Sequence, residues 1–172
     1  MAQITLITGG ARSGKSRFAE SLAMKQGEPL LYIATAGFGD REMAERIASH
    51  QERRGAVWQT IEEQYDLVGV LKGHDGWFNA TLVDCVTLWL TNLLLKLEVK
   101  TAVLEEVRRT ASIFHTLKTP LILVSNEVGM GIIPDNPLGR TFCDLSGEAN
   151  EILAAAADEV YVTFSGLPLK LK

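Results

Sequence analysis

A run of small residues with a single lysine near the start of the chain has the spacing G-x-x-x-x-G-K-S. It reads Gly9-Gly10-Ala11-Arg12-Ser13-Gly14-Lys15-Ser16. Glycines let successive backbone N–H groups converge on phosphate oxygens, and a lysine at this position reaches the β- and γ-phosphates of a nucleotide. We therefore expect residues 9–16 to bind nucleotide, with Lys15 acting in catalysis and the Ser16 hydroxyl holding Mg²⁺.

The segments on either side of this motif supply the strand–loop–helix context that a phosphate loop needs. Residues 3–8 are rich in β-branched side chains and predict a strand, and residues 16–24 have helical spacing with Phe18 and Leu22 on one face. The N-terminus of such a helix adds its partial positive charge to the phosphate site. A chance glycine-rich turn would lack this context, so we interpret the motif as a P-loop.

Asp84 is the candidate for a second residue at the metal ion, beside Ser16; we call this its metal-side role. It ends an apolar stretch, Thr81-Leu82-Val83, that predicts a strand. P-loop folds place an acid at the end of a neighbouring strand to meet Mg²⁺ directly or through water. The alternative is that Asp84 caps the helix predicted over residues 87–96. We favour the metal-side role, because the carboxyl ends of strands line the ligand crevice of open α/β sheets.

His50 has two interpretations from its spacing. On a helix it shares a stripe with Met43 and Ile47, and this spacing by itself favours a partly buried packing histidine. Its neighbours Arg53 and Arg54 could form only a solvated helix end. Beside a bound nucleoside triphosphate the same residues could act, because neutral imidazole is a competent nucleophile at phosphorus and arginines neutralise transferring oxygens.

A long irregular segment, residues 126–140, follows the clearest buried strand of the sequence, residues 121–125. It leaves the sheet on the ligand side, and long ordered loops in compact domains are often functional. Met130, Ile132 and Ile133 would offer apolar surface to a bulky partner. The spacing does not decide between a ligand contact and a subunit contact.

The composition limits the classes of protein to which the chain could belong. It has 172 residues, of which 47% are hydrophobic, and a net charge of −4. These values suit one folded domain over residues 1–172 and argue against a general nucleic-acid binder. Cys85 and Cys143 show no metal-binding spacing and are expected to be free thiols in a reducing compartment.

The predicted location is the cytoplasm. A strand is expected directly after the first methionine, which leaves no room for a signal peptide. The longest apolar run, residues 88–97, is interrupted by Thr91, Asn92 and Lys96 and is too short to cross a bilayer. We therefore expect no stable membrane insertion.

Strand and helix patterns alternate along the chain, which predicts an α/β fold with a mostly parallel sheet. Strands are expected at residues 3–8, 30–34, 57–61, 81–84, 121–125 and 160–164. Helices are expected at residues 16–24, 41–54, 65–72, 87–96, 101–117 and 142–157. The strand at 57–61 is predicted at an edge, and Trp77 and Trp89 are predicted in the core. The architecture expected is a three-layer fold of the P-loop NTPase type.

The chain as a whole resembles the bifunctional adenosylcobinamide kinase / adenosylcobinamide-phosphate guanylyltransferase family of cobalamin biosynthesis. A P-loop by itself is shared by many folds, but the stretch Asn126-Glu127-Val128-Gly129-Met130-Gly131-Ile132-Ile133-Pro134 together with His50 is far more specific. The motifs that carry the resemblance lie in residues 8–16, 32–36, 42–50, 83–94, 125–134, 157–161 and 166–170.

This resemblance implies two reactions. ATP or GTP would phosphorylate a hydroxyl of adenosylcobinamide, and GTP would then donate GMP to that phosphate through a guanylylated histidine. By motif position the histidine is His50, which replaces the packing interpretation. The resemblance also implies a homotrimer and a set of guanine-nucleotide contacts: Thr35, Ala36, Gly37, Gln51, Glu52, Arg53, Arg54, Glu62 and Asp84.

Two other functions compete with this one. A kinase of a different small alcohol would use the same P-loop and leave His50 structural. A nucleotide-dependent switch would be expected to carry an Asn-Lys-x-Asp signature after a central strand. The chain instead has Asn126-Glu127-Val128-Gly129 there, without the lysine and the aspartate, which argues against a switch.

Overall fold

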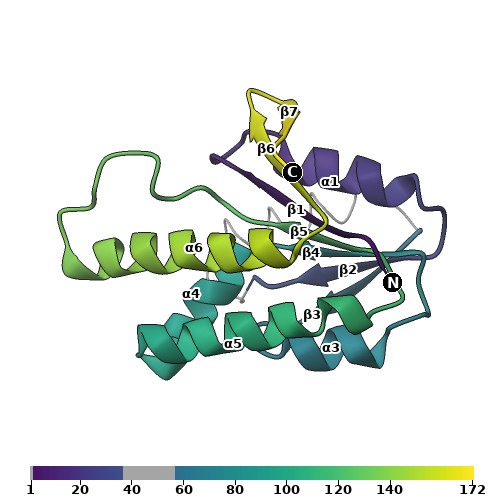
Figure 1. Ribbon diagram of the computed structural model, residues 1–172, viewed down its shortest axis with the longest axis horizontal. Coiled ribbons are helices and arrows are strands. Elements are labelled where there is room, and N and C mark those ends of the chain that lie inside the picture. The colour runs from purple at the N-terminus through teal and green to yellow at the C-terminus, as the bar shows by residue number, and fades with distance from the viewer. Residues whose placement is uncertain (1, 37–56) are drawn as a thin grey trace.

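The fold is a seven-stranded sheet with helices on both faces (Figure 1). The computed structural model describes residues 2–36 and 57–172. The strands are β1 (Ile4–Gly9), β2 (Leu30–Ala34), β3 (Trp58–Glu62), β4 (Ala80–Asp84), β5 (Leu121–Val124), β6 (Glu159–Phe164) and β7 (Leu167–Lys170). The helices described are α1 (Lys15–Met24), α3 (Leu67–Gly73), α4 (Val86–Leu97), α5 (Lys100–Ser112), the short 3-10 helix η1 (Phe114–Thr116) and α6 (Pro137–Ala156).

The strand order β3-β2-β4-β5-β1-β6-β7 places the predicted P-loop strand inside the sheet. All neighbouring pairs are parallel except β6 and β7, which form an antiparallel hairpin. Parallel strands end at one edge, so the residues that follow β1, β2, β4 and β5 converge there. The expected α/β fold with a mostly parallel sheet is therefore confirmed.

Alternation along the strands divides the core into two layers. Leu6 and Ile33 belong to the layer formed with α3, α4, α5 and α6, whereas Ile7 and Tyr32 belong to the layer formed with α1. Successive strand residues point to opposite faces, so a strand that is covered on both sides is apolar throughout. This explains why all residues of β1, β2 and β5 are buried.

Most predicted elements agree with the structure to within a few residues, and β3 is an edge strand as expected. The helix predicted over 41–54 lies outside the described residues. The helix predicted over 101–117 is shorter, because α5 ends at Ser112 and η1 follows it. Of the two tryptophans predicted in the core, Trp89 is 1% exposed, but Trp77 is 70% exposed and stacks edge-on against His74.

Two features near the C-terminus were not predicted. Helix α6 begins at Pro137, several residues before the expected start, because the Asn136 side chain caps it by accepting a hydrogen bond from the Gly139 N–H at 2.7 Å. Strand β7 was missed entirely, since it is short, contains Pro168 and is exposed throughout. Among residues 2–36 and 57–172, no helix is long and apolar enough to cross a membrane.

Candidate active site

The P-loop residues connect the end of β1 to the start of α1, as the motif predicted. Gly9 and Gly14 have φ angles of 146° and 98°, which glycine adopts far more easily than other residues. A Cβ at Gly9 would lie 2.6 Å from the Thr163 carbonyl oxygen, and one at Gly14 would lie 3.0 Å from Gly166 Cα. Gly9 and Gly14, the two fixed glycines of the G-x-x-x-x-G-K-S spacing, therefore meet a conformational and a steric requirement.

The β6–β7 hairpin supports the P-loop from one side (Figure 1). The Ser13 hydroxyl lies 2.7 Å from the Thr163 hydroxyl, and the Gly166 N–H donates to the Ser13 carbonyl at 2.8 Å. The Thr163 hydroxyl is 3.3 Å from the Thr8 carbonyl, to which it donates. Its single proton is thereby used, so the Ser13 hydroxyl is the donor toward Thr163.

Lys15 is the buried cation of the site. Its side chain folds back so that Nζ donates to the Gly10 carbonyl at 2.6 Å, and the residue is 7% exposed. Burial lowers the pKa of Lys15 below its ordinary value, while the nearby Cys85, Asp84 and Glu127 act in the opposite direction. The ammonium group thus lies within the field of two carboxylates that come from different strand ends.

Asp84 is the last residue of β4, level with Ala34 of β2 and Val124 of β5. It does not cap α4, because Cys85 occupies the N-cap position and makes no side-chain cap hydrogen bond. The structure therefore places Asp84 at the carboxyl edge of the sheet with Lys15, in the position predicted for a metal-side acid. Ser16 is half-buried in the first turn of α1.

Among the predicted guanine contacts, Thr35 and Ala36 directly follow β2, and both are buried. The Thr35 hydroxyl donates to the Cys85 carbonyl at 2.6 Å and accepts from the Cys85 N–H at 2.8 Å. The Asn92 amide donates to the Thr35 carbonyl at 2.8 Å. These bonds tie the end of β2 to the start of α4, so the Thr35 hydroxyl is already engaged within the protein.

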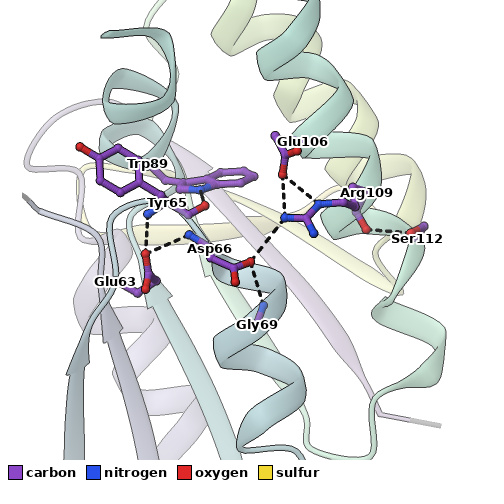
Figure 2. A network of polar contacts seen from close by, with 8 residues as sticks. All are labelled: Glu63, Tyr65, Asp66, Gly69, Trp89, Glu106, Arg109 and Ser112. Carbon is purple, nitrogen blue, oxygen red and sulfur yellow. Dashed lines mark hydrogen bonds and ion pairs between the residues drawn. The ribbon is translucent and has the colours of Figure 1, made fainter. Parts of the chain in front are cut away.

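Glu62 is the exposed last residue of β3, paired with Ala34 in the parallel register. The turn after it is held by the network drawn in Figure 2. The Glu63 carboxylate accepts from the N–H groups of Tyr65 and Asp66 at 2.7 and 2.9 Å. The Trp89 indole donates to the Tyr65 carbonyl at 2.9 Å. Glu62 therefore lies at the end of a strand whose following turn is held by these bonds. Strand β2 separates it from β4.

The structure adds one site residue to which the sequence reasoning gave no role, Glu127. Its N–H donates to the Gly9 carbonyl at 3.0 Å, so it lies against the start of the P-loop. The signal that could have found it is its position just after the strand predicted at 121–125, which lies next to β1. The sequence could show that this strand is buried but not which strand it pairs with.

Several predicted site residues lie outside the described residues: Gly37, His50, Gln51, Glu52, Arg53 and Arg54. The residues that the structure brings together are therefore the P-loop, Asp84 and Glu127. Within residues 2–36 and 57–172 there is no cluster of three or more His, Cys, Asp or Glu residues that could hold a metal ion.

Comparison with known proteins decides the family. Residues 5–171 match the model of the family described as cobinamide kinase / cobinamide phosphate guanyltransferase. The chain belongs to this family. It is 44% identical to the bifunctional adenosylcobalamin biosynthesis protein CobP of Pseudomonas aeruginosa, over 97% of this chain and 96% of that protein. It is 40% identical to the protein CobU of Salmonella typhimurium, over 97% of this chain and 98% of that protein.

The family assignment confirms the resemblance seen in the sequence. The expected enzyme class, a bifunctional kinase and guanylyltransferase of cobalamin biosynthesis, is confirmed over a kinase of another alcohol and over a switch. The fold is also similar to that of the P4 protein from bacteriophage phi6 in complex with ADP, with a TM-score of 0.51 and 17% identity. That similarity covers 97% of this chain but 52% of the P4 chain, and it concerns the fold alone.

Proposed function

We propose that this chain phosphorylates adenosylcobinamide with ATP or GTP and then transfers GMP from GTP to the resulting phosphate. The products of the second step are adenosylcobinamide-GDP and pyrophosphate. The observation that carries the proposal is a complete P-loop whose buried Lys15 shares the carboxyl edge of the sheet with Asp84 and Glu127, in a chain of this family. A single nucleotide-binding domain over residues 1–172 accords with one sheet that contains every described strand.

The P-loop would bind the phosphates of either nucleotide. The N-terminus of α1 points its free N–H groups at the loop, and Lys15 would exchange the Gly10 carbonyl for a phosphate oxygen. A buried ammonium is well suited to this, because its attraction to phosphate is stronger where water is excluded. In both reactions Lys15 would stabilise the negative charge that develops on the leaving phosphates.

Mg²⁺ fits the oxygen donors at this edge of the sheet. The Ser16 hydroxyl and the Asp84 carboxylate are hard ligands of the kind that Mg²⁺ prefers, and the substrate would supply the other oxygens. The ion, when bound, would neutralise charge on the phosphates. Because Asp84 does not cap α4, its carboxylate is not required for the helix.

His50 is proposed as the nucleophile of the second reaction, although it lies outside the described residues. Its ring nitrogen would form a P–N bond to the α-phosphorus of GTP while the bond to the β-phosphate oxygen breaks and pyrophosphate leaves. The phosphate of the acceptor would then attack the same phosphorus and release the histidine. Arg53 and Arg54 would neutralise the transferring oxygens. Guanine contacts are proposed for residues 35–37, 51–54, Glu62 and Asp84.

The loop between β5 and α6 is proposed to meet a bulky acceptor or a neighbouring subunit of a homotrimer. Figure 1 shows it projecting beyond the end of the sheet beside the start of α6. Met130, Ile132 and Ile133 on this loop are 68%, 98% and 77% exposed. Such a set of exposed apolar side chains is typical of an interaction site. We further propose a cytoplasmic enzyme without nucleic-acid partners or stable membrane insertion.

Separate assays of the two reactions test this proposal. The purified chain would be incubated with adenosylcobinamide and γ-labelled ATP or GTP, and separately with adenosylcobinamide phosphate and α-labelled GTP. We expect label in the corrinoid product in both assays, and loss of both activities in Lys15→Ala. A chain that phosphorylates another small alcohol but no cobinamide would contradict the proposal.

A further inference from the structure

Glu127 is a carboxylate of the site that the proposed roles leave unused. It follows β5, which pairs with β1 so that Val124 lies beside Ile7. Its N–H donates to the Gly9 carbonyl, the first residue of the P-loop, at 3.0 Å. The backbone that carries this carboxylate is therefore bonded directly to the loop that would hold the phosphates.

The side chain of Glu127 has a defined orientation as well. Nδ2 of Asn150, on α6, lies 3.3 Å from Glu127 Oε1 and 3.3 Å from the Asn126 carbonyl, and donates to both. Oδ1 of Asn150 accepts from the Ser125 hydroxyl at 2.7 Å. Asn150 is 8% exposed. A single buried amide thus fixes the start of the loop and one oxygen of the carboxylate, leaving the other oxygen for a further partner.

Glu127 also contributes to the electrostatic environment of Lys15. Asp84 at the end of β4 and Glu127 just after β5 both favour the charged form of Lys15, so two carboxylates from different strand ends lie near its ammonium group. In the proposed function the Asp84 carboxylate interacts with Mg²⁺. Beyond Glu127 the chain continues into the loop proposed above to meet the acceptor or a neighbouring subunit, where Val128, Met130 and Ile132 are exposed.

We propose that Glu127 is the catalytic base of the kinase reaction and that Asn150 is its positioning residue; the inference rests on the proposed function. The acceptor hydroxyl oxygen forms a bond to the γ-phosphorus while the bond between that phosphorus and the β,γ-bridging oxygen breaks. The nucleoside diphosphate leaves with the electron pair of that bond. Glu127 takes the hydroxyl proton, so charge and atoms balance.

The second reaction, guanylyl transfer, needs no catalytic base. Its nucleophile is a phosphate monoester, whose oxygens carry negative charge at neutral pH because the second pKa of such a group is about 6. No proton has to be removed before it attacks the guanylylated histidine. Loss of Glu127 should therefore separate the two activities, whereas loss of a residue that binds nucleotide or metal should lower both.

The test compares Glu127→Gln with wild type in both assays. The kinase assay measures transfer from γ-labelled GTP to adenosylcobinamide, and the guanylyl assay measures transfer from α-labelled GTP to separately prepared adenosylcobinamide phosphate. We expect the kcat of the kinase reaction to fall by about 100-fold or more, as for loss of a general base, with guanylyl transfer within about 3-fold of wild type. Glu105→Gln, which changes an exposed glutamate on α5, is the matched control and should leave both activities unchanged.

Asn150→Asp tests the positioning role. The aspartate can still accept from Ser125 but cannot donate to Glu127, so kinase kcat should fall while the KM for GTP stays near that of wild type.

Equal loss of both activities in Glu127→Gln would overturn the inference, and so would full kinase activity in that variant. Failure of the wild-type chain to phosphorylate adenosylcobinamide would overturn the proposed function itself, and the wild-type assay distinguishes this failure from the others.

Discussion

The side-chain hydroxyls of Ser13 and Thr163 lie 2.7 Å apart in the interior, although 150 residues separate them in sequence. One belongs to the P-loop and the other to β6, so the bond connects the phosphate site to the C-terminal hairpin. The Gly166 N–H reinforces this connection through the Ser13 carbonyl at 2.8 Å. The conformation of the P-loop therefore depends on the last strands of the sheet as well as on its own glycines.

Thr163→Val tests this connection. The substitution preserves the shape of the side chain but leaves the buried Ser13 hydroxyl without its acceptor. We expect the free energy of unfolding to fall by about 1–3 kcal/mol, the usual cost of such a buried polar group. We also expect weaker nucleotide binding, measured by titration with a fluorescent GTP analogue. Thr163→Ser restores a hydroxyl and should recover most of both losses, and a valine variant as stable as wild type would contradict the assignment.

Gly9→Ala and Gly10→Ala form a matched pair within the P-loop. A Cβ at Gly9 would meet the Thr163 carbonyl and hydroxyl oxygens at 2.6 Å and would have to adopt a φ of 146°, whereas Gly10 has nothing within 4 Å. Gly9→Ala should lower the melting temperature by several degrees, because steric strain of this kind costs on the order of 1–3 kcal/mol. Gly10→Ala should melt close to wild type in the same thermal scan without nucleotide. Equal losses of melting temperature in the two variants would show that the close approach of Thr163 does not require glycine at position 9.

Cys85 provides a prediction of pH dependence. Burial, with the nearby Asp84 as a second cause, raises the pKa of its thiol from 9.0 to about 11. Between these values the unfolded chain releases the proton while the folded chain retains it, so stability is present below pH 9 and falls as the pH rises toward 11. The stability difference between wild type and Cys85→Ala should therefore shrink by about 2 kcal/mol across this range.

Urea unfolding at pH 8, 9, 10 and 11 measures this difference. Lys15 is present in both proteins, so the contribution of its own titration to stability largely cancels in the difference. Val86→Ala, a truncation of the neighbouring buried residue that does not titrate, is the control. Its difference from wild type should stay constant with pH. If the difference in the free energy of unfolding between wild type and Cys85→Ala is also constant with pH, the thiol has the same pKa in the folded and unfolded chains, which would contradict the prediction.

The sequence predicted the P-loop and the sheet because their signals are local. Glycine spacing, a buried strand before it and an amphipathic helix after it are all contained in residues 3–24. Alternating apolar strands and helical stripes likewise gave the parallel sheet. The start of α6 was missed although Asn136-Pro137 is a helix-start signal, because Pro134 and Gly139 nearby favour an irregular loop.

Glu127 and Trp77 show what local patterns cannot supply. The role of Glu127 depends on β5 lying next to β1, and this pairing is a long-range property of the fold. Trp77 is apolar and was expected to be buried, but it lies in the turn before β4, where it is 70% exposed. The antiparallel β7, which carries Pro168, is stabilised by pairing with β6 rather than by its own residues.

Ile132→Ser combined with Ile133→Ser tests the role of the projecting loop. The two side chains are 98% and 77% exposed, so their loss should not destabilise the isolated subunit. If they contact the acceptor, the KM for adenosylcobinamide should rise about 10-fold or more while nucleotide binding is unchanged. Sedimentation of the variant is measured in parallel, because dissociation to smaller species would identify a subunit contact instead. An unchanged KM with unchanged sedimentation would contradict both roles.

The proposed guanylyl transfer depends on covalent guanylylation of His50. Wild type and His50→Ala would be incubated with Mg²⁺ and GTP labelled at either the α- or the γ-phosphate, and the protein-bound label would be measured after denaturation. We expect wild type to retain label from α-labelled GTP only, labile in acid and stable in base as for a P–N bond, and we expect His50→Ala to retain none. Equal α-label in His50→Ala, or no label in wild type, would contradict it.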